Sequence, residues 1–321
     1  MRQEAYFCTV KELDELGKNN IPRQLISHTH LIYSSPATLA FNSPGAEGFG
    51  VKRAGLAVPD SVMLIVSPGC CGRNTSVLSS MRAYQDRFYY LLMDETDIVT
   101  GRHLKKIPKA VAEICEGLKK KPSVVMICIT CVDALLGTDM ERVCHKAEEY
   151  AGVPVRPCYM YALTREGRKP PMVHVRQSVY SLLEPKKKKG NVVNLLGYFS
   201  PLTDDCELYD LLHGAGVKTI HEISRCKDYA QYQTMSEANF NLVLHPEARF
   251  AAEDFHDRLK IPYIELRRLY QIDKIASQYR AFAAALGVEF EDEIPRKAAE
   301  EAVEKFRKIH PDAVFAVGEW M

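Results

Sequence analysis

The sequence predicts an α/β protein made of two Rossmann-like domains, each a parallel sheet flanked by helices. Short apolar runs alternate with helix-like stretches across residues 61–157, and the alternation restarts at Gly190, after four consecutive lysines. Such alternation is typical of βαβ units. With 321 residues, 46% of them apolar, the chain can bury two cores. We expect an N-terminal segment at 1–40, a first domain carrying a cysteine site at 41–185, and a second domain at 190–321.

The first half should contain four strands and three helices beyond a polar helix near residues 10–20. In chain order, the alternation of apolar runs, turns and helix-like stretches assigns them to 62–66 (strand), 75–88 (helix), 97–99 (strand), 104–118 (helix), 124–129 (strand), 139–151 (helix) and 153–157 (strand). The lysines at 186–189 have no interleaved aromatic residues, which favours a solvated linker over a phosphate-binding patch.

The second half repeats the pattern. We expect strands at 191–199, 218–223, 240–245 and 263–266, and helices at 208–213 and 251–259. Two further helices near 271–286 and 295–310 precede a short apolar run at 313–318, which reads as a terminal strand. Two sheets covered by helices are therefore the predicted architecture.

Composition narrows the classes of function. Lys plus Arg (42) nearly cancels Asp plus Glu (41), so no global basic field favours nucleic acid. Neither a membrane span of roughly 20 apolar residues nor a signal peptide is visible, so we expect a cytoplasmic protein with no membrane partner. In a reducing compartment the ten cysteines are metal ligands, redox thiols or small buried hydrophobes rather than disulfides. The GxGxxG, GxxxxGK[ST] and GxSxG motifs are missing, so any reductive chemistry must draw its electrons from a partner.

Three cysteines follow predicted strands. Cys70 and Cys71 lie between two glycines in the turn after the strand at 62–66, and Cys131 ends the apolar run that starts at Val124. Open α/β sheets bind ligands at the carboxyl ends of their strands, where helix N-termini also favour thiolates. This placement indicates an iron–sulfur or other soft-metal site. Cys128 has CxxC spacing to Cys131 but lies inside the strand, where a small buried hydrophobe is expected.

His245 is a second candidate, because it directly follows the apolar strand segment 239–244 of the second domain. A lone histidine is more often structural than catalytic, yet a position at a strand's carboxyl end favours a functional role, so both interpretations stay open. His174 is a weaker candidate, and His28 and His30 fit a loop.

Four stretches carry a resemblance to the nitrogenase component 1 superfamily. Ser67-Pro-Gly-Cys70 resembles its Gly-Pro-x-Gly-Cys turn, and Asp94-Glu-Thr-Asp-Ile-Val-Thr-Gly101 its acidic segment. Thr130-Cys-Val-Asp-Ala-Leu-Leu-Gly-Thr-Asp139 resembles its second cysteine turn. Val193-Asn-Leu-Leu-Gly197, with Glu207-Leu-Tyr-Asp-Leu-Leu212, resembles the start of its second domain. The likeness covers roughly residues 40–321.

The resemblance implies a 4Fe–4S or larger iron–sulfur cluster near a subunit interface, reduced by an ATP-dependent iron–sulfur partner. Cys70 matches the second ligand and Cys131 the third, while Ser43 stands where the family has its first cysteine. Serine is a harder and poorer ligand for iron than thiolate, so either Ser43 or Cys71 is expected to complete the set. His245 falls near the position of the cysteine that anchors the catalytic cofactor of nitrogenase subunits, and the chain resembles a short form without the family's third domain.

The leading functional expectation is therefore an oxidoreductase subunit, working as a homo- or heterodimer, that relays electrons from the reductase through its cluster to a reductive reaction. Two alternatives remain. One is a metallocluster scaffold or carrier without turnover, which Ser43 and the short form favour. The other is a relative without a cluster that binds a small organic ligand between its domains.

Overall fold

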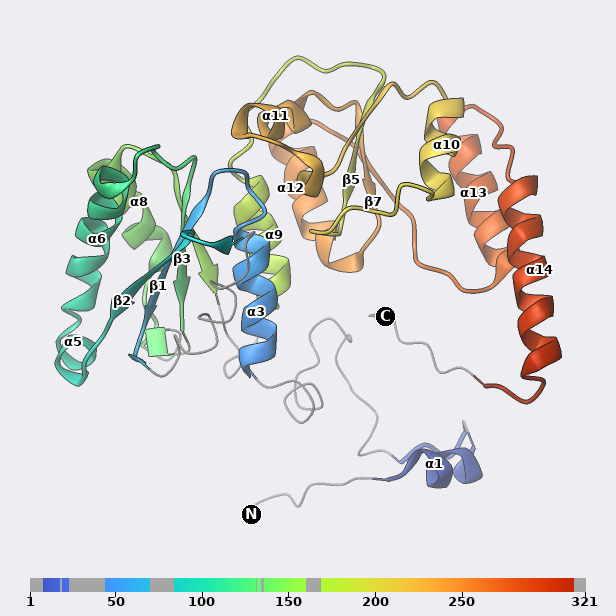
Figure 1. The fold of residues 1–321 in the computed structure, drawn as a ribbon, viewed down its shortest axis with the longest axis horizontal. Helices are drawn as coiled ribbons and strands as arrows, with labels where there is room; N and C mark the ends of the chain where they lie inside the picture. Colours follow the sequence, from blue (N-terminus) through green and yellow to red (C-terminus); the bar gives the residue numbers. More distant parts are fainter. Residues whose placement is uncertain are drawn as a thin grey trace.

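The computed structural model describes residues 8–17, 19–22, 44–69, 84–130, 132–133, 136–159 and 169–314, with only the backbone described for 44–49. Its strands form two parallel four-stranded sheets, in the orders β2-β1-β3-β4 and β6-β5-β7-β8 (Figure 1). The strands are β1 Val62–Ser67, β2 Phe88–Leu92, β3 Val125–Ile129, β4 Val155–Tyr159, β5 Val192–Leu196, β6 Thr219–His221, β7 Phe240–Val243 and β8 Tyr263–Glu265. The predicted class of two helix-flanked parallel sheets is confirmed, and the exact domain limits stay a prediction.

Helices cover both faces of each sheet. The α-helices are α1 Val10–Leu16, α3 Pro44–Gly55, α5 Glu95–Thr100, α6 His103–Gly117, α8 Met140–Ala151, α9 Pro171–Tyr180, α10 Glu207–Gly214, α11 Tyr229–Gln233, α12 Arg249–Leu259, α13 Ile272–Leu286 and α14 Glu293–Ile309, and the 3-10 helices are η5 Ile223–Arg225, η6 Thr234–Glu237 and η7 Pro246–Ala248. Helices α6 and α8 cover one face of the first sheet and α3 and α9 the other. Helices α10 and α13 cover the outer face of the second sheet, and α11 and α12 cover its inner face.

The central strand β1 shows how the sequence produces this layering. All six of its residues are buried, as expected for a parallel strand with helices on both faces. Because successive side chains point to opposite faces, Leu64 and Val66 pack with the α6 and α8 cluster, whereas Met63 and Ile65 pack with α3 and α9. The strand shows no alternation of apolar and polar residues, because both of its faces pack against apolar helix surfaces.

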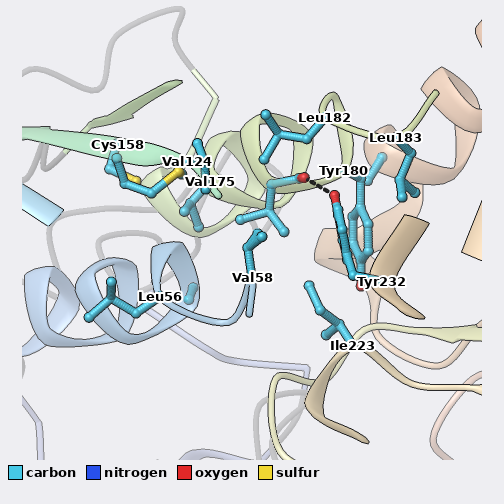
Figure 2. Packing of buried hydrophobic residues seen from close by; sticks show 14 of the residues in the cluster. Leu56, Val58, Val124, Cys158, Val175, Tyr180, Leu182, Leu183, Ile223 and Tyr232 are labelled. Carbon is cyan, nitrogen blue, oxygen red and sulfur yellow. Dashed lines mark hydrogen bonds between the residues drawn. The ribbon is translucent and has the colours of Figure 1, made fainter. Parts of the chain in front are cut away.

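A continuous core joins the two sheets through α9, which lies between them (Figure 1). Figure 2 shows Val58 from the first half packed near Ile223 and Tyr232 from the second. The buried Tyr232 hydroxyl donates a hydrogen bond to the carbonyl oxygen of Val179 in α9. Since the shared core holds both sheets against the same helix, the two sheet edges keep a fixed relation.

Two sequence predictions for the first sheet need correction. The strand predicted at 97–99 is helical and belongs to α5, because Asp94 and Asp97 form a reciprocal capping box and Gly101 ends the helix at φ 63°. The second strand is instead β2, and its Phe88 was placed at the end of a predicted helix. Most of that helix, 75–88, lies outside the described residues, and residues 84–87 form a turn.

Other expectations have mixed outcomes. The strand predicted at 153–157 begins two residues later, and helices α3 and α9 were not predicted. The apolar run at 313–318 lies mostly outside the described residues, and its first two residues have no regular structure. Residues 186–187 are exposed, as expected for a linker, while Lys188 and Lys189 bind Ser236 and Glu237 near η6. Within the part of the chain that is described, no helix is long and apolar enough to cross a membrane.

Candidate functional site

The carboxyl edge of the first sheet brings together the two strands that precede the predicted cysteine turns. Strands β1 and β3 are neighbours at the centre of the sheet, and Val66 is paired with Ile129 at their ends. The chain leaves β1 toward β2 on one side and β3 toward β4 on the other, so the strand order reverses here. Open α/β sheets bind ligands at such a switch point. Cys70 follows β1 by three residues and Cys131 follows β3 by two.

The predicted ligands themselves, Cys70, Cys71, Cys131 and Ser43, lie outside the described residues, so their assignment stays a prediction. Across the ranges that are described, no three His, Cys, Asp or Glu side chains gather in a group that could hold a metal ion. Any cluster at this edge would therefore depend on the two cysteine turns.

Three buried oxygen atoms at this edge have no hydrogen-bond partner in the described structure. They are Oγ of Ser67, Oγ1 of Thr130 and Oδ2 of Asp133, in residues that are at most 3% exposed. A buried polar atom without a partner costs about 1–3 kcal/mol. Hydroxyl groups can donate hydrogen bonds to cluster sulfurs, and such bonds tune iron–sulfur centres. The orphaned hydroxyls beside thiol-bearing turns thus fit an iron–sulfur group.

The buried His103 contacts Asp133, two residues after Cys131. His103 at the N-terminus of α6 places Nε2 2.8 Å from Oδ1 of Asp133 and Nδ1 3.0 Å from the carbonyl oxygen of Asp97. Because a carbonyl oxygen only accepts, Nδ1 carries a proton. Thr138 donates a second hydrogen bond to the same Asp133 oxygen, at 3.0 Å. The His103–Asp133 pair was not predicted from the sequence, since no local spacing signals a contact across 30 residues.

The acidic segment of the predicted family motif has a structural role beside this pair. The Asp97 carboxylate is buried and accepts hydrogen bonds from Lys106 and Arg102, both at 2.7 Å. These contacts, that of Lys106 foremost, hold the pKa of Asp97 well below its usual range. The charged carboxylate therefore ties α5 to α6, and its backbone carbonyl positions His103.

At the second sheet, the same topology places His245 at the corresponding edge. Strands β5 and β7 are the central neighbours, and His245 follows β7 by two residues, the spacing that Cys131 has after β3. Gly197, directly after β5, has φ 141°, and a Cβ there would lie 2.8 Å from both N and Cβ of His245. Glycine is thus required for this close approach.

Burial keeps the His245 imidazole neutral. Its pKa is lowered from 6.5 to about 4, first by burial and then by the charges of Arg176 and Arg268. The backbone N–H of Glu247 donates to Nδ1 at 3.3 Å, which leaves the proton of the neutral ring on Nε2. A neutral imidazole is the form that binds metals.

Arg176 of α9 closes the second edge, and sequence analysis did not identify it. Its buried guanidinium donates to the carbonyl oxygen of Gly197 at 2.7 Å and to Oε2 of Glu247 at 2.6 Å. Two residues earlier on the same helix, the ring of His174 packs 4.3 Å from that of Tyr159, at the end of β4. Burial lowers the pKa of His174. One helix therefore contacts the carboxyl edges of both sheets.

These features define a class of protein: an α/β protein with two parallel sheets of the same strand order, each with candidate ligand-binding residues at its switch point. The model of the nitrogenase component 1 type oxidoreductase family matches residues 47–314. The chain belongs to this family, as the sequence motifs predicted.

Individual relatives agree with this membership. The nitrogenase iron-molybdenum cofactor biosynthesis protein NifE of Nostoc sp. (strain PCC 7120) is 27% identical over 239 residues, which cover 72% of this chain and 49% of the relative. NifE of Klebsiella pneumoniae is 26% identical over 266 residues, covering 76% and 58%. The chain thus spans about half the length of the curated relatives it matches. A solved structure described as nitrogenase Cp1 at pH 6.5 covers 94% of this chain and is itself covered over 66%, with a TM-score of 0.60 and 17% identity, a likeness of fold.

Proposed function

We propose that this chain is a subunit of a scaffold that holds a metal–sulfur cluster and passes it on. The observation that carries the proposal is the pair of buried hydroxyls of Ser67 and Thr130, which have no partner in the described structure, at the edge where both cysteine turns begin. The similarity to proteins named for iron-molybdenum cofactor biosynthesis supports a role in cofactor assembly. Electron relay, the leading expectation from sequence, becomes the second candidate.

In this proposal Cys70 and Cys131 bind a 4Fe–4S or larger cluster, with Cys71 or Ser43 as a further ligand. The bound cluster would supply a reservoir of iron, sulfide and electrons. The hydroxyls of Ser67 and Thr130 would donate hydrogen bonds toward its sulfurs, while the His103 contact would keep the Cys131 turn in position. A ligand set with only two matched cysteines binds less tightly than three thiolates, which favours release to an acceptor.

The proposal includes a partner chain and a compartment. A homodimer, or a heterodimer with a second nitrogenase-like subunit, would enclose the first edge, and an ATP-dependent iron–sulfur reductase would adjust the cluster's oxidation state. A cytoplasmic location would keep the thiols reduced. Nucleic acid and membranes are not expected partners.

The decisive experiment measures iron and sulfide per chain after anaerobic purification. We expect C70S and C131S each to lose most of the iron, and C71S to show whether Cys71 completes the ligand set. C226S is the matched control, because Cys226 is a half-buried free thiol whose Sγ donates to the Glu222 carbonyl away from this edge. Full iron in C70S, C71S and C131S alike would remove the proposed site. Wild-type protein without iron would instead support the relative that has lost its cluster.

The neutral, buried His245 at the second edge favours electron relay as the second candidate, since it could bind a metal or a reacting group. The two functions differ in stoichiometry. A scaffold should transfer its cluster once to an apo-acceptor and show no steady-state product with the reductase. A relay should retain its cluster and turn over repeatedly, with loss of turnover but not of iron in H245Q.

A further inference from the structure

The outer side of the second sheet contains a pocket whose lining, among the described residues, does not include His245. It measures about 460 Å³ and lies beyond the carboxyl ends of β5, β7 and β8, between helices α10 and α13. This size falls within the range of roughly 300–1,000 Å³ that is typical of small-molecule sites. Leu202, Leu208, Leu244, Leu266 and Ile275 contribute apolar walls. The position is again a switch point, because β5 and β7 are the central pair.

Two adjacent arginines give this pocket its charge. Arg267 and Arg268 line it and are exposed, and neither has a carboxylate within 4.0 Å among the described residues. Other arginines at the same edge are ion-paired: Arg225 with Glu222, and Arg249 with Glu265. Arginines at this edge form ion pairs where a carboxylate lies within reach. Arg267 and Arg268 have no such partner among the described residues, so their guanidinium groups are available to a ligand.

The backbone beneath the arginines is fixed. Gln278 of α13 accepts a hydrogen bond from the Arg267 N–H at 2.8 Å and donates one to the Arg267 carbonyl oxygen at 2.9 Å. The pocket's own carboxylate, Glu207, accepts a hydrogen bond from the Tyr279 hydroxyl at 2.9 Å. The guanidinium of Arg268 lies 5.7 Å from the centre of the Tyr198 ring. The pocket therefore has two arginines at its rim, on a fixed backbone, above apolar walls.

We propose that this pocket binds a small organic anion, with its carboxylate or phosphate group on Arg267 and Arg268 and its apolar body against the leucines. Arginine binds both anionic groups through paired N–H donors. Because the walls are apolar, a ligand with an apolar body fits this pocket better than a purely ionic one such as free sulfate. This site is independent of the proposed cluster, since none of its lining residues belongs to the first sheet.

A fluorescent probe pair tests the charge and the apolar body separately. The probe 8-anilinonaphthalene-1-sulfonate carries both features, and N-phenyl-1-naphthylamine is its uncharged counterpart. We expect one sulfonate probe per wild-type chain and about tenfold weaker binding in R267Q and in R268Q, from the loss of a charge-assisted contact. Binding of the neutral probe should not change. R280Q is the matched control, because Arg280 is exposed on α13 outside the pocket lining.

A second readout needs no variant. Cys206 lines the pocket whereas Cys226 does not, so the bound sulfonate probe should slow iodoacetamide alkylation at Cys206 and leave Cys226 unchanged by site-resolved mass spectrometry. Competition by 3-phenylpropionate or by phenyl phosphate then identifies the preferred anionic group. Unchanged sulfonate affinity in both arginine variants, or equal alkylation of Cys206 with and without the probe, would overturn the proposal.

Discussion

The two sheets have the same strand order, but the buried polar groups at their carboxyl edges are hydrogen-bonded differently. At the second sheet, Arg176 binds both the Gly197 carbonyl oxygen and Glu247, so these two groups at the switch point are satisfied within the chain, and the orphaned amide atoms of Asn194 and Asn241 lie back within the strands. At the first sheet, Ser67, Thr130 and Asp133 each leave a buried oxygen without a partner in the described structure. Because unsatisfied buried groups are costly, the orphaned hydroxyls favour a ligand at the first edge, whereas the groups around Arg176 at the second edge are held by bonds within the chain.

The largest expected effect comes from opening the second edge. R176M would leave Glu247 buried without its cation and the Gly197 carbonyl without its donor, at a cost of about 3–5 kcal/mol in the free energy of unfolding. Chemical denaturation measures this loss. R296Q is the control, since Arg296 forms ion pairs with Asp273 and Glu300 that are exposed on both sides and contribute about 0–1 kcal/mol. A loss below 1 kcal/mol in R176M would mean that this edge does not depend on the arginine.

Acid should weaken the second edge through His245. Its pKa is about 4 in the folded chain and 6.5 when exposed, so between these values the unfolded chain binds a proton that the folded chain does not. Stability is therefore complete above pH 6.5, falls as the pH drops toward 4, and loses at most about 3 kcal/mol. Burial lowers the pKa values of His174 and His221 in the same direction.

The measurement is the unfolding free energy of wild type and H245Q across this pH range. The variant should show a flatter profile, whereas H256Q, a change at an exposed histidine, should keep the wild-type slope. Identical slopes for wild type and H245Q would show that His245 is not the group responsible.

A methyl group at Gly197 should force β5 and β7 apart at their ends. In G197A the new Cβ would meet the backbone nitrogen of His245 at 2.8 Å, and alanine is strained at φ 141°. We expect a loss of about 2–3 kcal/mol from strain and overpacking. G214A is the matched control, because a Cβ at Gly214 meets nothing within 4 Å. Equal stability of both variants would contradict the close approach.

Sequence could predict the features that depend on neighbouring residues. The apolar runs gave β1, β3, β5 and β7, and with them the two switch points. The prediction at 97–99 was wrong because the two apolar residues Ile98 and Val99 could not outweigh the Asp94–Asp97 capping box, which is itself visible in the sequence.

The site was less predictable, because its chemistry depends on contacts between distant residues. Arg176 meets Glu247 across 71 positions, and His103 meets Asp133 across 30. A proline at the first position of α9 was a local signal for a helix, but nothing local showed that this helix would reach both edges. His245 was found because its position after a strand is a local property.

The smallest effect compares a buried serine at the first edge with a buried serine of η6, before β7, because the same substitution should change stability with opposite signs at the two positions. Ser67 and Ser236 are both fully buried, but Oγ of Ser67 has no partner in the described structure, whereas Oγ of Ser236 donates to the Gln233 carbonyl at 2.8 Å. S236A should lose about 1 kcal/mol, and S67A should gain up to about 1 kcal/mol in cluster-free protein, since it removes an unsatisfied group. If the Ser67 hydroxyl serves a cluster, S67A should also lower iron retention after anaerobic gel filtration, while S236A should not. Destabilisation of the cluster-free chain by S67A would mean that this hydroxyl is already satisfied, and it would no longer support a ligand at the first edge.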